Sequence, residues 1–367
     1  MRIDRLSLSN FRNYGEQTIE FDRACNVICG ENAQGKTNLL EALTCLSVGR
    51  SPRTRSDREM IRFGESGFTI EGSIFSRERE FVSRIEVITG RKKKISINKV
   101  PAKSASELSG VLNTVFFSPE DLYLIKEGAA ARRRFMDASL TQLRPRYAAA
   151  LNEYNRLWEH KTRILRDCEE YPDLLKTLPE FDLRMAQTGA VLIHYRARFS
   201  RLLEQYAGAS HAECSGGREK LAIRYQTVST VSNPFADHET LVSQLLEHQR
   251  SHAGAEKAVR QCLSGPHKDD LDVELDGVSA KSFASQGQTR TAALSMKLAA
   301  REIHREIIGE YPVLLLDDVL SELDPRRQEF VLNRLGEGQV FITCCEEDRL
   351  HTMLSGKVFR ISGGKVV

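Results

Sequence analysis

Near the start of the chain stands the stretch Gly30-Glu31-Asn32-Ala33-Gln34-Gly35-Lys36-Thr37, which matches the pattern G-x-x-x-x-G-K-[ST]. Glycines at these positions let backbone N–H groups converge on phosphate oxygens, and a following helix aims its positive end at the same charge. In this pattern the lysine reaches the β- and γ-phosphates of a nucleotide, and the final hydroxyl ligates Mg²⁺. We therefore expect these eight residues to bind ATP and Mg²⁺, with Lys36 catalytic and Thr37 a metal ligand.

The flanking sequence supplies the context that such a phosphate-binding loop requires. Residues 1–29 alternate apolar and polar side chains and end in an apolar run, which indicates strands. Residues 38–47 carry leucines at helical spacing, namely Leu39, Leu40, Leu43 and Leu46. Because strand, glycine-rich turn and helix follow one another, a chance glycine-rich turn is the weaker explanation.

A second apolar run ends in two carboxylates. Residues 313–316 read Val-Leu-Leu-Leu, which is typical of a strand buried on both faces, and Asp317 and Asp318 follow directly. In P-loop enzymes an aspartate at such a strand end holds the metal ion. We expect Asp317 to be this metal ligand and Asp318 to orient or deprotonate the attacking water. The alternative, a buried strand that ends in a solvated acidic turn, is less favoured because the P-loop is present.

The wide separation of Lys36 and Asp317 favours ABC-type ATPase heads over small kinases and GTPases, in which the two motifs lie closer. Between them, Ala284-Ser285-Gln286-Gly287-Gln288 begins a long predicted helix. A serine, a glycine and a helix N-terminus form an anion site that could meet a γ-phosphate. A capped helix start without a ligand is the alternative. Because this stretch lies between the P-loop and the strand that ends at Asp317, we favour a signature loop, with Ser285, Gly287 and Gln288 as nucleotide contacts.

The organisation of the chain is discontinuous, with α/β patterns at both ends and helical periodicity in the middle. An apolar stripe from Leu140 to Trp158 predicts one helix face, within which Pro145 marks a kink or a helix start, and residues 182–206 complete a helical hairpin. We predict an α/β fold: an ABC-type P-loop ATPase head lobe from residues 1–117 and 306–367. The inserted second lobe, residues 118–305, is mainly α-helical and carries the signature motif.

Composition narrows the class of protein. A chain of 367 residues favours two lobes, and 41% hydrophobic with 28% charged residues suits globular cores. The net charge of +3 leaves polyanion binding to local patches. The eight cysteines show no zinc-site spacing, and Cys25 and Cys29 fit core thiols of a cytosolic protein. The first residues lack an apolar signal region and no run of about 18 apolar residues occurs, so we expect a cytoplasmic protein without membrane contact.

Together these motifs resemble the RecF family, bacterial recombination mediators with an SMC-like ATPase head. The resemblance rests on the segments Leu6–Tyr14, Gly30–Asn38, Phe116–Asp121, Arg132–Asp137, Gly265–Asp270, Ser285–Gln288 and Leu314–Asp324. It implies a weak, DNA-stimulated ATPase that dimerises through ATP, binds single- and double-stranded DNA near gaps and recruits RecR to help load recombinase. It adds Asn38 to the nucleotide site and implies that Arg12 approaches the nucleotide in cis. The signature residues would contact the γ-phosphate bound to the partner subunit.

The chain also departs from ABC transporters. Asp318 stands where those enzymes usually carry glutamate, and its shorter side chain predicts slower hydrolysis. No histidine follows the strand that ends near Thr343; Thr343 or Cys344 stands at this switch position, and His351 lies too far along. These departures, with no convincing transporter-docking glutamine, disfavour a nucleotide-binding subunit of a transporter. An ATP-binding DNA scaffold with negligible turnover remains an alternative, because the two aspartates permit hydrolysis without setting its rate.

Several basic clusters are candidates for DNA contacts, and we select Arg132, Arg133 and Arg134. For any single cluster a solvated helix face is the more common explanation. Basic residues do not alternate with aromatic ones, which argues against base stacking. We therefore expect salt-sensitive DNA binding with little sequence preference.

Overall fold

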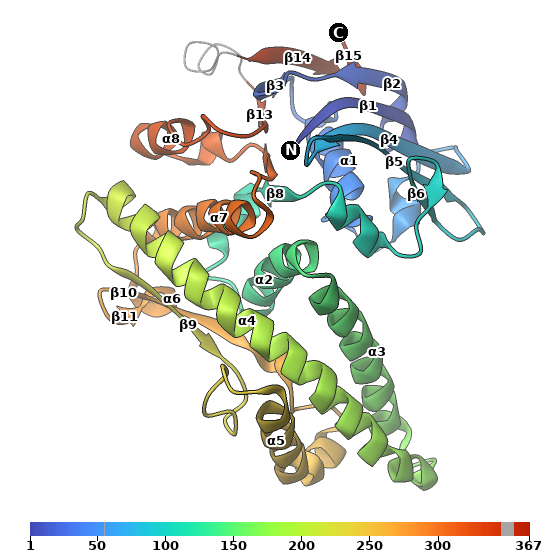
Figure 1. Cartoon of the computed structure of the whole chain (residues 1–367), viewed down its shortest axis with the longest axis vertical. Helices are drawn as coiled ribbons and strands as arrows, with labels where there is room; N and C mark the ends of the chain where they lie inside the picture. The colour runs from blue at the N-terminus through green and yellow to red at the C-terminus, as the bar shows by residue number, and fades with distance from the viewer. Residues whose placement is uncertain (55, 346–355) are drawn as a thin grey trace. The chain divides into compact units, whose positions relative to one another are not determined.

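The computed structural model describes residues 1–54, 56–345 and 356–367. Its contacts divide the chain into two compact units (Figure 1). Unit 1 comprises Met1–Tyr123 and Ala293–Val367, and unit 2 comprises Leu124–Ala292. Both ends of the chain thus build one unit and the middle builds the other. Within the described residues, no helix combines the length and the apolar character that a membrane span requires.

The first sheet of unit 1 is antiparallel and has the order β2-β1-β4-β5-β6-β7. Its strands are β1 (Arg2–Phe11), β2 (Tyr14–Glu20), β4 (Gly67–Ser76), β5 (Arg79–Ile88), β6 (Lys94–Ile97) and β7 (Val100–Pro101). Along β4, burial alternates at every residue, so the sheet has one core face. At Gly72 a Cβ atom would lie 2.4 Å from Leu46 Cδ1, so glycine lets the helix that carries Leu46 approach this strand closely.

The second sheet of unit 1 has the order β15-β14-β3-β13-β12-β8. Its strands are β3 (Cys25–Cys29), β8 (Thr114–Phe117), β12 (Val313–Leu316), β13 (Val340–Cys344), β14 (Lys357–Ser362) and β15 (Lys365–Val366). The strands from β14 to β8 run parallel, and β15 is antiparallel to β14. In parallel sheets the carboxyl ends of neighbouring strands meet at one edge, where ligands bind. Here that edge joins the ends of β3, β13 and β12.

Helix α1 (Lys36–Val48) lies between the two sheets (Figure 1). Leu39, Leu43 and Leu46 share one apolar core with side chains of both sheets, among them Ile70 and Phe341. A second core covers the other face of the parallel sheet. It contains Leu294 and Leu298 of α7 (Gln286–Ile308), together with residues of α8 (Pro325–Leu332). Cys25 and Cys29 are buried in this second core, as predicted.

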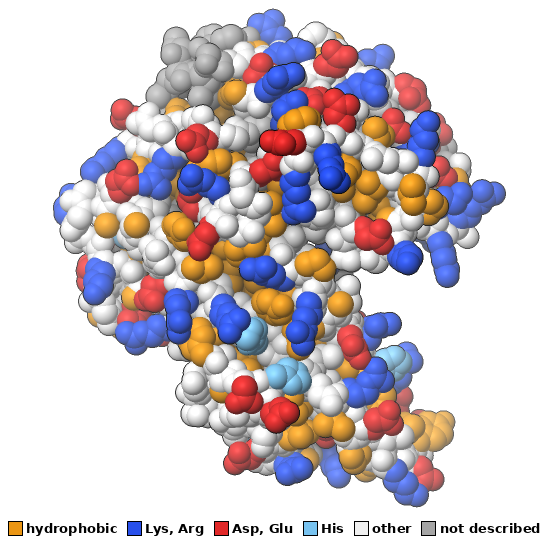
Figure 2. Space-filling view, viewed as in Figure 1, with side chains coloured by type: hydrophobic (Ala, Val, Ile, Leu, Met, Phe, Trp, Pro, Cys, Tyr) orange, Lys and Arg blue, Asp and Glu red, His pale blue; other side chains and the backbone are white. Residues whose placement is uncertain are grey.

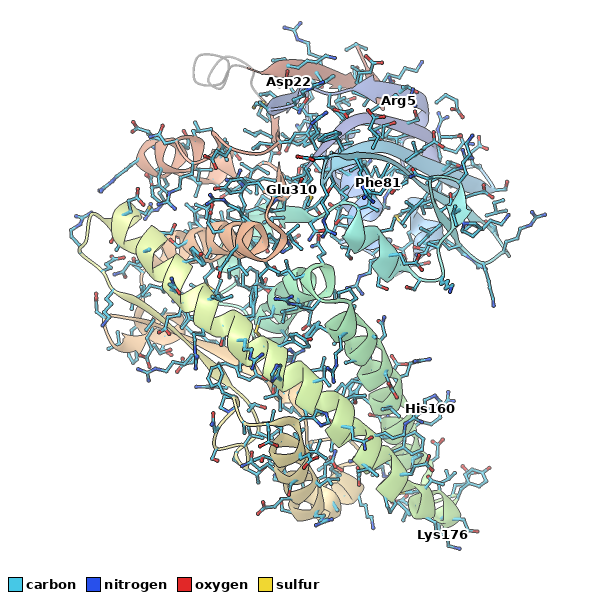
Figure 3. All side chains as sticks on the ribbon, viewed as in Figure 1. Arg5, Asp22, Phe81, His160, Lys176 and Glu310 are labelled. Atoms are coloured by element: carbon cyan, nitrogen blue, oxygen red, sulfur yellow. The ribbon has the colours of Figure 1, made fainter. Side chains whose placement is uncertain are left out.

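Unit 2 is mainly helical. It contains α2 (Ala129–Leu143), α3 (Pro145–Asp167), α4 (Leu178–Ser215), α5 (His238–Val259), α6 (Ala280–Phe283) and the start of α7. A small antiparallel sheet adds β9 (Leu221–Gln226), β10 (Asp270–Leu275) and β11 (Val278–Ser279). The long helices α3 and α4 form the expected hairpin, and Figure 3 labels Lys176 in the short 3₁₀ helix η4 (Pro172–Thr177) between them.

The apolar stripe from Leu140 to Trp158 lies on two helices and not on one helix face, and of the two alternatives for Pro145 the structure shows a helix start. Helix α2 ends at Leu143, and Pro145 occupies the first turn of α3. Arg144 between them is extended, with φ −139° and ψ 98°. The cause is steric, because the ring of a proline disfavours helical conformation in the residue before it.

Candidate nucleotide-binding site

The P-loop follows β3 and leads into α1, and its two glycines are required by close contacts. Gly30 has φ +153°, and a Cβ atom there would lie 2.4 Å from the backbone oxygen of Ile361. Gly35 has φ +120°, and a Cβ atom would lie 2.7 Å from the Asn13 amide. Both φ values fall where side chains are strongly disfavoured. The loop therefore keeps its shape only with glycine at both ends of the motif.

Lys36 places its charge inside this loop. Its Nζ donates hydrogen bonds to the backbone oxygens of Gly30 (2.6 Å) and Glu31 (3.2 Å). The residue is 5% exposed and begins α1, so the ammonium group and the positive end of the helix act at the same place. A buried cation held only by uncharged acceptors in these two bonds is well suited to an anionic ligand.

The carboxylate of Asp317 joins the P-loop to the parallel sheet. Thr37 Oγ1 donates to Asp317 Oδ1 at 2.9 Å, and Thr343 Oγ1 donates to the same oxygen, also at 2.9 Å. Asp317 follows β12 and Thr343 lies in β13, the neighbouring parallel strand, so the sheet brings these two residues together, and Thr37 joins them from the first turn of α1. Burial raises the pKa of Asp317, while the hydrogen bonds from Thr343 and Thr37 act in the opposite direction.

The donor set of Thr37 and Asp317 fits Mg²⁺. This ion prefers hard oxygen ligands in octahedral geometry, and proteins usually bind it through one or two carboxylates together with phosphates and water. The hydroxyl and the carboxylate lie within 2.9 Å of each other beside Lys36. A cation at this position would also offset the burial that raises the pKa of Asp317.

Asp318 adopts a left-handed backbone conformation, with φ 55°. Its backbone N–H donates to Thr343 Oγ1 at 2.8 Å, so one threonine hydroxyl contacts both aspartates. Its carboxylate lies 4.0 Å from Cys345 Sγ, which is itself 3.4 Å from Lys36 Nζ. Asp318 and Lys36 therefore both lie close to the Cys345 thiol. Of the switch candidates it is Thr343 that contacts Asp317, and His351 lies outside the described residues.

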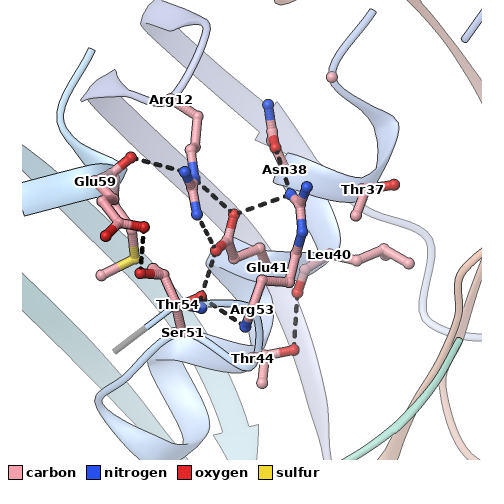
Figure 4. Close-up of polar contacts among 12 residues, drawn as sticks. Arg12, Thr37, Asn38, Leu40, Glu41, Thr44, Ser51, Arg53, Thr54 and Glu59 are labelled. Carbon is pink, nitrogen blue, oxygen red and sulfur yellow. Dashed lines mark hydrogen bonds and ion pairs between the residues drawn. The ribbon is translucent and has the colours of Figure 1, made fainter. Parts of the chain in front are cut away.

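Arg12 is bound to the P-loop helix through a buried carboxylate (Figure 4). Its Nε and Nη2 donate to the two oxygens of Glu41 at 2.9 and 2.7 Å, and its Nη1 donates to the backbone oxygen of Glu59 at 2.7 Å. Ser51 also donates to Glu41, whose side chain is fully buried. Arg53 lies 3.5 Å from Glu41 and donates to Asn38 Oδ1 at 3.0 Å. This cluster connects Asn38 of the predicted site to Arg12.

Sequence reasoning missed Glu41, Arg53 and Asn13, although one signal was present. Glu41 interrupts the otherwise apolar face of the helix that begins at Lys36, and a buried acid there requires a cationic partner. Asn13 Nδ2 donates to the backbone oxygen of Gln34, and Asn13 Oδ1 accepts from Asn38. Asn13 thus holds the P-loop from the turn after β1.

The predicted signature residues cap the start of α7. The Ser285 backbone N–H donates to Gln288 Oε1 at 2.8 Å, and the Gln288 backbone N–H donates to Ser285 Oγ at 3.2 Å. This reciprocal pair is a capping box, which satisfies two N–H groups of the first helical turn. Gly287 lies in that turn. These residues belong to unit 2, whereas the P-loop and Asp317 belong to unit 1.

The three arginines chosen as DNA contacts differ sharply. Arg132 is 4% exposed and pairs with Asp270 at 2.6 Å, so the structure removes it from the candidate DNA contacts. Its position on the inner face of α2 is the physical reason. Arg133 is half-buried and donates to the backbone oxygen of Asp269 at 2.6 Å. Arg134 is exposed, 3.6 Å from Glu127. Figure 2 shows basic and acidic side chains interspersed over the face that it presents.

The segment Gly265–Asp270 builds a buried polar core in unit 2. Arg196 donates to Asp269 at 2.7 Å and to Asp137 at 2.9 Å, with its own side chain 3% exposed. At Gly265 a Cβ atom would lie 2.2 Å from the Tyr154 hydroxyl, so glycine is required there. Asp137 and the two aspartates of this segment thus neutralise Arg196 and Arg132, which gives the motif a structural role.

Comparison with known proteins assigns the family. The family model "RecF/RecN/SMC N terminal domain" matches residues 2–364. The chain is 40% identical to "DNA replication and repair protein RecF" of Agathobacter rectalis, over 100% of this chain and 99% of the relative. It is 39% identical to the protein of the same name from Acetivibrio thermocellus, over 95% of this chain and 94% of the relative. The chain belongs to the RecF family.

Solved structures agree with this assignment. A structure of the recombination mediator protein RecF with ATP in the RecFOR pathway has a TM-score of 0.90 at 34% identity, covering 100% of this chain and 96% of that one. The Smc head domain of Pyrococcus furiosus, bound to the C-terminal domain of ScpA, has a TM-score of 0.56 at 17% identity, covering 100% and 95%. The first match supports the RecF family and the second supports the head fold alone. The predicted fold class is confirmed.

Proposed function

We propose that this chain is an ATP-dependent DNA-binding protein of recombinational repair and replication maintenance. The observation that carries the proposal is the junction of Thr37, Asp317 and Thr343 beside the buried ammonium of Lys36. This junction lies at the carboxyl edge of the parallel sheet, next to the N-terminus of α1. Its chemistry suits a nucleotide triphosphate with Mg²⁺, and relatives solved with ATP share the fold.

Each residue of the site has a distinct task in this proposal. The P-loop amides from Gly30 to Thr37 and the Lys36 ammonium bind the phosphates, and Thr37 with Asp317 holds Mg²⁺. The bound ion supplies charge neutralisation at the transferred phosphate. Thr343 fixes the orientation of Asp317, and Asp318 orients the attacking water. Because an aspartate reaches less far than a glutamate, we expect weak ATPase activity.

In the second part of the proposal, two copies of the chain enclose two nucleotides. The capped N-terminus of α7 presents Ser285, Gly287 and Gln288 to the γ-phosphate held by the P-loop of the partner subunit. Closure would hold DNA near single-strand gaps, through phosphate contacts and without reading sequence. Hydrolysis, stimulated by DNA, would then release it. Recruitment of RecR, which helps to load recombinase, is carried over from the family.

The decisive experiment is the solution mass of the pure protein without nucleotide, with Mg-ATP, and with Mg-ATP and a gapped duplex. We expect Mg-ATP to double the mass, and DNA to be retained by the doubled form. Ser285→Arg should abolish doubling while ATP still binds, and Lys36→Met should abolish both. A constant mass in the presence of bound ATP would remove the trans-signature mechanism and leave a monomeric nucleotide-binding module. Equal DNA retention by Lys36→Met and the unmodified protein would remove the ATP dependence.

A further inference from the structure

The carboxylate of Glu219 contacts the signature loop. Gln288 Nε2 donates to Glu219 Oε1 at 3.0 Å, and the other carboxylate oxygen of Glu219 lies 3.0 Å from His211 Nε2. Glu219 comes from the connection between α4 and β9, and its side chain is 22% exposed, whereas His211 on α4 is fully buried. All of these residues belong to unit 2, so their arrangement does not depend on where unit 1 lies.

The two ends of the Gln288 amide are therefore assigned to different partners. Its oxygen accepts from the Ser285 backbone N–H, and its nitrogen donates to Glu219. A carboxylate accepts only, so it selects the amide orientation that places the oxygen on Ser285. The cap uses Ser285 Oγ as an acceptor, and the same hydroxyl still has one proton to donate.

We infer that Glu219 is a positioning residue for the signature motif and that His211 supports it. Glu219 holds the Gln288 amide in one orientation, which keeps the capping box closed before any partner arrives. The closed box presents the Ser285 hydroxyl, at the N-terminus of α7, to an anion, the γ-phosphate on the partner subunit. The inference rests on the proposed function, in which the signature loop meets that nucleotide.

Pre-organisation is the physical reason for an effect on dimerisation. Glutamine loses considerable rotamer freedom when it is fixed, and a loop that is already fixed does not lose it again on binding. Hydrogen bonds to a charged acceptor are stronger than neutral ones, so a carboxylate fixes the amide well. His211 and Gln288 between them contact both carboxylate oxygens, so the carboxylate is held from two sides.

The test compares Glu219→Ala, Glu219→Gln and the control Lys220→Ala, which changes the exposed neighbour in the same connection. Three quantities are measured on the full chain: the dissociation constant of the Mg-ATP dimer by sedimentation, the dissociation constant for ATP by titration, and hydrogen exchange at the backbone N–H groups of Ser285 and Gln288. Glu219→Ala should weaken the dimer about tenfold and accelerate exchange at both amides, while ATP affinity stays within about twofold. Glu219→Gln retains an acceptor for the Gln288 amide and should stay close to the unmodified protein, as should Lys220→Ala.

The outcomes separate this inference from the proposed function. If the unmodified protein dimerises with Mg-ATP and Ser285→Arg does not, but Glu219→Ala dimerises normally, the positioning role is wrong and the proposed function stands. If Glu219→Ala and Glu219→Gln weaken the dimer equally without faster exchange at Ser285 and Gln288, Glu219 acts through its charge and the positioning role is again wrong. If the unmodified protein does not dimerise, both proposals fail together.

Discussion

The ion pair between Arg12 and Glu41 decides whether Arg12 serves the nucleotide or the fold, and Glu41→Gln tests it. Glu41 is fully buried on α1 and accepts from two nitrogens of Arg12, at 2.9 and 2.7 Å, and from Ser51. Glutamine keeps the side-chain volume but removes the charge. It also turns one acceptor oxygen into a donor that faces the guanidinium. The Arg12 side chain, 20% exposed, would lose its charged partner and one of its two bonds to residue 41, and would keep its bond to the backbone oxygen of Glu59.

The expected cost is large for a single substitution. Removing one partner of a buried ion pair costs roughly 3–5 kcal/mol of unfolding free energy. The partial exposure of Arg12 lets water solvate part of the charge, so we expect about 2–3 kcal/mol here. In a unit of roughly 200 residues this corresponds to a melting temperature lower by about 5–10 °C.

Thermal unfolding and ATP titration together provide the assay. The matched control is Glu71→Gln, which breaks the exposed pair with Arg84 at 3.2 Å and should cost less than about 1 kcal/mol. Equal melting temperatures for Glu41→Gln and Glu71→Gln would refute the reasoning. Arg12→Met should lower the melting temperature in the same way. If it instead weakened ATP binding at unchanged stability, Arg12 would act on the nucleotide and not on the fold.

Three further predictions test other parts of the molecule. Cys345 is exposed and its Sγ lies 3.4 Å from Lys36 Nζ, so saturating Mg-ATP should slow its labelling by maleimide at least about tenfold. Labelling is followed by mass spectrometry, and Cys168 in unit 2, the control, should react at an unchanged rate. Equal protection of both thiols would contradict a local effect of the nucleotide. Burial lowers the pKa of His304 to about 3, so the unfolded chain binds the extra proton and stability falls as the pH drops below about 6.5. Between pH 7 and 5 this histidine should account for roughly 2 kcal/mol in denaturant titrations, and His304→Gln should flatten the pH profile by that amount. An unchanged profile would show that His304 takes up a proton as readily in the folded chain as in the unfolded chain. Arg134→Ala should reduce the salt slope of DNA binding by about one, measured by fluorescence anisotropy, and an unchanged slope would remove Arg134 as well from the candidate DNA contacts.

The parts that could be predicted from the sequence are those in which neighbouring residues determine the conformation. The P-loop needs a strand, two glycines and a helix within a short stretch, and each leaves a local pattern. Asp317 was predictable because a continuous apolar strand ends at it. Thr37 ends the loop that follows β3, and Asp317 follows β12. Their contact is expected once β3 and β12 belong to one parallel sheet, because the carboxyl ends of parallel strands share an edge.

The parts that could not be predicted depend on which face of an element is buried. Arg132 and Arg134 lie in one basic run, yet one is buried against Asp270 and the other is exposed. Adjacent helical residues point in different directions, and only the packing of α2 decides which direction is the interior. The pairing of Arg12 with Glu41 likewise joins a strand end to a helix, and no local pattern connects the two.

Thr343 gives a physical meaning to one departure of this chain from ABC transporters, the absence of a histidine at the switch position after β13. At the end of β13 its hydroxyl donates to Asp317 and accepts from the backbone of Asp318, so it fixes the two predicted catalytic acids with respect to each other. A histidine at such a place could exchange a proton near neutral pH, whereas a threonine hydroxyl orients its neighbours without titrating. We therefore expect Thr343→Val to lower the ATPase rate with little change in ATP affinity, because the phosphates contact other residues. A loss of ATP affinity equal to the loss of rate would mean that Thr343 supports nucleotide binding itself. The two results would also separate an ATP-driven switch from a scaffold, since only the switch requires Asp317 and Asp318 to be held for catalysis.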